Sequence, residues 1–119
     1  MIAEELNKGE PTVAVMGLDH ARWHKPLTAL FDGTSLSLTF SDDLKGLSLC
    51  SALKNIYAVG LGMAEGLKEE TNMKSVITEK ALNEMLEIVP LLGGKKETVT
   101  GLAGLGDLLT TGWSEKSYN

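Results

Sequence analysis

The chain has 119 residues, of which 43% are hydrophobic, 23% are charged and 5% are aromatic, and it carries a net charge of −5. This length fits one domain with a core of its own, and a mean hydropathy of +0.02 excludes wholesale disorder. The sequence pI of about 5.0 argues against a nucleic-acid-binding groove, which requires clustered cations. Because Cys50 is the only cysteine, an intramolecular disulfide framework and a Cys₂ zinc site are both excluded.

The N-terminal ten residues are polar and have neither the basic segment nor the apolar segment of a secretory signal peptide. We therefore expect a cytoplasmic protein.

The first third of the chain predicts a strand, a helix and a second strand. Residues 12–16 are short and rich in β-branched side chains, and residues 35–40 alternate polar and apolar side chains as a half-buried strand does. Between them, apolar side chains recur at helical spacing. That helix is capped by Asp19 or begins at Pro26, since a proline fits best in a first turn.

From residue 41 onward the pattern becomes helical. Ser41 and Asp42 are N-cap residue types at the start of an apolar run, residues 44–67, which is nearly long enough to cross a bilayer. Lys54 and Asn55 lie in the middle of that run, so we expect a buried helix of a soluble protein and no membrane span. A second helix begins near residue 71 and is expected to end at Pro90.

Two shorter helical segments follow, at residues 97–102 and from residue 101 onward. The change in pattern at residues 41–44 predicts a domain boundary. The fold class is mainly α with a small β component, that is, α+β.

Lys54 stands out because its helical face carries no other charge. The neighbours three, four and seven positions away on that face are Leu47, Cys50, Ser51, Tyr57, Ala58 and Leu61. This pattern predicts a lysine in a cavity or beneath another element. The alternative is a lysine that extends its ammonium to the surface along its own stem.

Asp107 follows a run of small and apolar residues, Gly101 to Gly106, that allows backbones to pack closely. A carboxylate at that place is expected to be partly buried, and the alternative is an ordinary helix N-cap. The glycines are ordered G-x-x-G-x-G, whereas a dinucleotide site needs G-x-G-x-x-G between a strand and a helix. His20 and His24 have no third ligand nearby, so we interpret them as surface histidines and not as a metal site.

Two segments carry the motifs of a known family. Residues 51–58 read S-A-L-K-N-I-Y-A, and residues 101–108 read G-L-A-G-L-G-D-L. They resemble the G-A-L-K-N and G-L-A-G-x-G-D-L motifs in the helical domain of the NAD(P)-dependent sn-glycerol-3-phosphate dehydrogenases. The order of the motifs and the separation between Lys54 and Asp107 match that family without a gap. Weaker matches at residues 2–5, 41–43 and 82–85 extend the resemblance over essentially the whole chain.

The resemblance implies a division of the chain. Residues 1–40 would be a remnant of the end of the dinucleotide-binding domain, and residues 41–119 the first part of the all-helical substrate-binding domain. The glycine-rich part of the nucleotide-binding domain, a second active-site lysine and the final helices of the family have no counterpart here, so the chain is expected to be a piece of a longer enzyme.

The resemblance also implies a reaction, the reduction of dihydroxyacetone phosphate by NAD or NADP in its reduced form to sn-glycerol 3-phosphate. Lys54 would be the catalytic general acid and base. Asp107, Thr111, Ser117 and Asn119 would bind substrate. Tyr118 stands where the family has a phosphate- and cofactor-binding arginine, so no residue of this chain is assigned to the cofactor.

We accordingly expect the isolated chain to be inactive and to bind no NAD(P)H. The alternative is a non-catalytic, oligomerising helical module derived from the same family. In either case we expect a homo-oligomer, because two lone strands leave unpaired edges and the helical part lacks its final helices. Association would use residues 11–16, residues 35–40 or the C-terminal helical surface.

Overall fold

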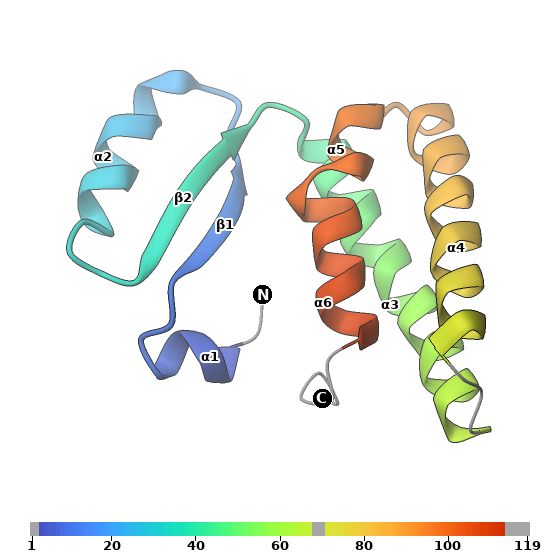
Figure 1. The fold of residues 1–119 in the computed structure, drawn as a ribbon. Helices are drawn as coiled ribbons and strands as arrows, with labels where there is room; N and C mark the ends of the chain where they lie inside the picture. The colour runs from blue at the N-terminus through green and yellow to red at the C-terminus, as the bar shows by residue number, and fades with distance from the viewer. Residues whose placement is uncertain (1–2, 68–70, 114–119) are drawn as a thin grey trace.

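The computed structural model describes residues 3–67 and 71–113, and these form two parts that lie side by side (Figure 1). The first part holds two strands with helices around them. Its elements are α1 (Ala3–Asn7), β1 (Thr12–Gly17), the 3₁₀ helix η1 (Ala21–Trp23), α2 (His24–Leu30) and β2 (Leu36–Ser41). The second part is helical throughout. Its elements are α3 (Leu44–Gly66), α4 (Thr71–Leu91), α5 (Lys96–Thr100), the π-helix η2 (Leu102–Gly106) and α6 (Asp107–Trp113).

The predicted strand–helix–strand unit is confirmed. Strands β1 and β2 pair in parallel, in a register that runs from Thr12 opposite Leu36 to Gly17 opposite Ser41. The helix between them begins at His24, so the two predicted starts were wrong. Pro26 is instead the third residue of the first turn, where its missing N–H costs no helical hydrogen bond.

Helix α1 was not predicted, because its five residues are mostly polar and show no apolar periodicity. An ion pair between Lys8 and Glu4, with 2.6 Å between nitrogen and oxygen, joins the end of this helix to its first turn.

The helical part is organised around α3, which lies between α4 and α6 (Figure 1). Its core combines side chains from all the α-helices of this part. The members are Cys50, Leu61, Ala81, Met85, Val89, Val99 and Leu108. The mainly helical fold class is therefore confirmed. Cys50 is fully buried as a small apolar side chain, and this burial raises the pKa of its thiol.

Helix α3 is capped by Asp43 and not by Ser41 or Asp42, although all three are favourable cap types. The Asp43 carboxylate accepts a hydrogen bond from the Gly46 N–H at 2.9 Å, while the Ser41 hydroxyl accepts one from the Asp43 N–H at 3.1 Å.

Helix α4 continues one residue beyond Pro90, which corrects the predicted end. The helix is closed by two N–H groups of the following turn. Those of Gly93 and Gly94 donate to the carbonyls of Pro90 and Val89 at 3.0 and 2.9 Å. Gly93 has a φ of +90°, which a glycine adopts without strain.

The segment after α5 is a π-helix and not the start of the predicted α-helix. The Gly106 N–H donates to the carbonyl of Gly101, five residues earlier, at 3.2 Å. Gly104, in the middle of η2, is buried against α5. A Cβ atom at Gly104 would lie 2.1 Å from the carbonyl oxygen of Val99, so the close backbone packing expected of this glycine run is present.

Helix α3 is the one helix of the described residues whose length and composition would allow it to cross a membrane. Two of its three charged side chains have partners within the fold, since Lys54 pairs with Asp107 and Glu65 pairs with Lys74 at 3.5 Å. With α4 and α6 packed against it, these ion pairs support the reading of α3 as the central helix of the bundle.

Candidate functional site

Lys54 and Asp107 form an ion pair, although 53 positions separate them in the sequence. The Lys54 ammonium, from the middle of α3, donates to the carboxylate of Asp107 at the start of α6. Both side chains are mostly covered, with 19% and 21% of their surface exposed. Lys54 thus lies beneath another element, as its uncharged helical face predicted, and its ammonium ends on a carboxylate.

Asp107 is the first helical residue of α6 and has αR backbone angles, so it does not have the extended conformation of a typical N-cap. Partial burial alone would raise the pKa of this carboxyl group. Positive neighbours outweigh that effect, and the hydrogen bond and charge of Lys54 contribute to a pKa below the ordinary value. Asp107 is therefore ionised at neutral pH and able to hold a cation or accept a hydroxyl hydrogen bond.

The pair lies in a cavity of about 1030 Å³ between β1 and the helical part. Besides the two charged groups, the wall contains hydroxyl and amide side chains, namely those of Thr12, Ser48, Ser51, Asn55 and Thr110, and the carboxyl group of Glu5. The rest of the wall is mostly apolar and includes Val13, Leu44 and Leu47. Such a wall, with an ammonium and a carboxylate in contact, suits a small polar molecule rich in oxygen.

Asn55 and Thr110 line this cavity but were not assigned by the sequence. Asn55 directly follows Lys54, and its amide donates to the Ser51 carbonyl at 3.2 Å. Thr110 lies three residues after Asp107 on α6, and its hydroxyl donates to the Gly106 carbonyl at 2.9 Å. Helical spacing from Asp107 is the signal that points to Thr110.

The other residues predicted to bind substrate are placed only in part. Thr111 is half-buried on α6, one turn after Asp107, and it is the neighbouring Thr110 of this helix that lines the cavity. Ser117, Tyr118 and Asn119 lie outside the described residues.

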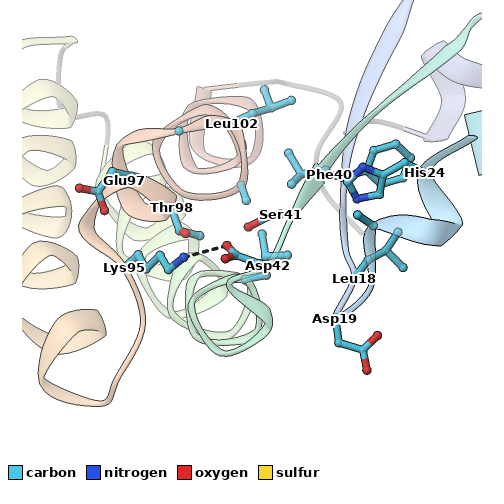
Figure 2. A pocket seen from close by; sticks show the side chains of 15 residues that line it. Leu18, Asp19, His24, Phe40, Ser41, Asp42, Lys95, Glu97, Thr98 and Leu102 are labelled. Atoms are coloured by element: carbon cyan, nitrogen blue, oxygen red, sulfur yellow. Dashed lines mark hydrogen bonds and ion pairs between the residues drawn. The ribbon is translucent and has the colours of Figure 1, made fainter.

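A second cavity, of about 850 Å³, lies between the strand unit and the start of α5 (Figure 2). On one side His24 stacks on Phe40, with 4.3 Å between ring centroids, so His24 is not the plain surface histidine predicted from sequence. On the other side Lys95 pairs with Asp42 at 2.8 Å. Both side chains of this pair are mostly exposed, at 54% and 78%, whereas the Lys54–Asp107 pair in the first cavity is mostly covered.

Among the described residues, the turn after β1 differs from that of a dinucleotide site. Strand β1 leads through Leu18, Asp19 and His20 into a 3₁₀ helix, whereas a pyrophosphate needs a glycine-rich turn that directs helical N–H groups toward it.

Comparison with known proteins identifies relatives of one kind. The family model described as "NAD-dependent glycerol-3-phosphate dehydrogenase C-terminus" matches residues 43–119. A glycerol-3-phosphate dehydrogenase [NAD(P)+] of Polaromonas sp. strain JS666 is 38% identical over 117 residues, which are 98% of this chain and 33% of the relative. The protein of the same name from Coxiella burnetii strain Dugway is 36% identical over 118 residues, which are 99% of this chain and 36% of the relative.

Solved structures show the same likeness in three dimensions. The crystal structure of glycerol-3-phosphate dehydrogenase from Coxiella burnetii matches with a TM-score of 0.92 and 35% identity, covering 98% of this chain and 36% of that chain. The glycerol-3-phosphate dehydrogenase of Saccharomyces cerevisiae matches with a TM-score of 0.82 and 27% identity, covering 98% and 36%. This chain spans about a third of the length of the curated relatives that it matches.

Proposed function

Because the chain belongs to the NAD-dependent glycerol-3-phosphate dehydrogenase family, we propose that it supplies the substrate side of an enzyme interconverting dihydroxyacetone phosphate and sn-glycerol 3-phosphate. One observation carries the proposal: the mostly covered Lys54–Asp107 ion pair in the wall of a cavity. A three-carbon hydroxyketone bound in this cavity would meet a proton donor and a carboxylate.

In this function Lys54 is the general acid of reduction. As a hydride adds to the carbonyl carbon, the carbonyl oxygen takes a proton from the Lys54 ammonium, and the product is a secondary alcohol. In the reverse direction the neutral amine accepts that proton. Asp107 accepts a hydrogen bond from a substrate hydroxyl and keeps the lysine directed into the cavity.

The remaining assignments follow from the family motifs. Thr111, Ser117 and Asn119 contact substrate. Tyr118 replaces an arginine that would form a bidentate hydrogen bond with phosphate. NAD or NADP supplies the hydride in the parent enzyme, and this chain alone binds neither. The parent enzyme is placed in the cytoplasm.

We also propose that residues 1–40 end a nucleotide-binding domain and that residues 41–119 begin the substrate domain. Two observations support this division. A two-residue connection separates the strand unit, which ends at Ser41, from the first helix of the bundle, which begins at Leu44, and the family model of the C-terminal part begins at residue 43.

The function is tested with a chimera in which these 119 residues replace the matching segment of the Coxiella burnetii enzyme. We expect NAD(P)H-dependent reduction of dihydroxyacetone phosphate, because the two chains superpose over 98% of this one. The Tyr118→Arg version is expected to have a lower KM for dihydroxyacetone phosphate, since it restores a cation for phosphate. A chimera that folds and binds cofactor but is inactive in both versions would contradict the proposal.

A non-catalytic, self-associating module is the second candidate, and an exposed apolar stripe on α3 favours it. Ile56, Val59, Met63 and Leu67 follow one another at helical spacing, and each is 65–75% exposed. None of these four residues lines the cavity around Lys54, so association and catalysis do not exclude each other.

We expect the chain to form a homodimer or larger assembly at tens of micromolar, and the Val59→Glu and Met63→Glu double variant to shift it toward monomer. Light scattering measures both masses. A wild-type mass of 12.7 kDa with a cooperative thermal melt would contradict self-association.

A further inference from the structure

Asp43 is a buried carboxylate outside the cavity, at the first turn of α3, and only 6% of its surface is exposed. One oxygen accepts from the Gly46 N–H at 2.9 Å. The other accepts from the Lys95 N–H at 2.8 Å and from the Thr98 hydroxyl at 2.5 Å. A single carboxylate thus caps α3 and fastens the start of α5 to it.

The neighbouring charges do not share this task. The Lys95 side chain turns away to pair with Asp42, and Figure 2 shows that pair beside Thr98. Burial would raise the pKa of Asp43, but its hydrogen bonds, first that of Thr98, outweigh burial and hold the pKa below the ordinary value. Asp43 is therefore ionised at neutral pH and accepts all three hydrogen bonds.

Helix α5 and η2 pack closely, backbone against backbone. Gly104 packs directly on the backbone of Val99, and Val99 is itself fully buried in the core. Any displacement of α5 therefore moves η2 with it, because no free space separates the two backbones.

Element η2 runs without interruption into Asp107, whose carboxylate meets Lys54 on α3. The path from α5 to α6 packs along α3 and has two polar bonds to it, at Asp43 near the N-terminal end of α3 and at Lys54 three turns later. The bonds to Asp43 therefore help to set the position along α3 at which Asp107 meets Lys54.

We propose that Asp43 is a positioning residue, which sets the place of the Asp107 carboxylate against the Lys54 ammonium through α5 and η2. An effect of Asp43 on catalysis would rest on the proposed function, whereas its effect on the Lys54–Asp107 ion pair does not. Loss of the Asp43 anchor lets α5 and η2 shift and moves Asp107 away from the lysine.

The test is a carboxyl-detected NMR titration of Asp107 in the full chain. The charged groups around Asp107 are Lys54 on α3, Glu5 on α1 and a second positive group that also lowers the pKa of Asp107, and all of them are kept in the variants. We expect Asp43→Asn to raise the pKa of Asp107 by about half a unit or more, because the carboxylate loses part of the stabilisation by Lys54.

Substitutions of threonines in α5 test the same connection more mildly, and they serve in place of Asp43→Asn if that variant does not fold. Thr98→Val, which removes one hydrogen bond and keeps the shape, is expected to give a smaller upward shift. Thr98→Ser restores the hydroxyl and should return the wild-type value. Thr100→Val is the matched control, since the Thr100 hydroxyl bonds only to carbonyls of its own helix in the described structure.

An unchanged Asp107 titration in Asp43→Asn, or in Thr98→Val where the first variant is unfolded, overturns the inference even if stability falls. The titration of Asp107 does not depend on enzyme activity. If the chimera is inactive but the variants shift the pKa of Asp107 as expected, the result counts against the proposed function alone.

Discussion

Replacing Lys54 with methionine is expected to lower the turnover number of the chimeric enzyme by roughly 10²–10⁴-fold, the usual contribution of a positioned general acid. Methionine keeps the length of the side chain and its helix propensity but cannot donate a proton to the substrate carbonyl. Steady-state assays of dihydroxyacetone phosphate reduction measure the loss. The pair with Asp107 makes Lys54 the residue whose removal should cost most.

The matched control is Lys45→Met, which removes an exposed lysine from the same helix, more than two turns from Lys54. Its turnover number should stay within a factor of two or so of the unmodified chimera, since surface substitutions rarely have larger effects. Equal losses in the two variants would assign the effect to helix charge and not to proton transfer.

Gly104→Ala is expected to destabilise the chain by about 3 kcal/mol or more and to lower its Tm by more than about 10 °C. The added methyl group would overlap the backbone of Val99, with a carbonyl oxygen at 2.1 Å and two carbon atoms at 2.6 Å. These are backbone atoms of Val99, whose side chain is fully buried in the core. The overlap therefore cannot be relieved by rotating a side chain. Urea denaturation measures the free energy of unfolding.

Gly60→Ala is the control for the same chemical change in a helix. A methyl group at Gly60 meets nothing within 4 Å, so this variant should gain stability, by roughly 0.5–1 kcal/mol, from a less flexible unfolded chain. A Gly104→Ala variant as stable as the wild type would show that η2 does not pack on α5 as described.

The sequence predicted the order of the elements well where local pattern decides them. A short run rich in β-branched residues predicted β1, alternation predicted β2, and the apolar run predicted α3. It failed where tertiary contacts choose among equal local options. Ser41, Asp42 and Asp43 are all good caps, and Asp43 is used because Lys95 and Thr98, more than 50 residues later, also bond to it.

The site shows the same division. The uncharged face of Lys54 indicated cover, and the small residues before Asp107 indicated partial burial, but only the family motifs put the two in one site, since helical spacing says nothing about a residue on another helix. The π-helix that delivers Asp107 could not be predicted. Its extra residue depends on how Gly104 meets Val99, and this contact exists only in the folded chain.

The central claim is that Lys54 and Asp107 act as one unit, and a double-mutant cycle in unfolding free energy tests it most directly. The variants are Lys54→Met, Asp107→Asn and the two combined, each unfolded in urea at neutral pH. The pair is mostly covered, so we predict that the double variant loses less stability than the sum of the single losses, by roughly 1–3 kcal/mol. Losses that add to within about 0.5 kcal/mol would contradict the claim.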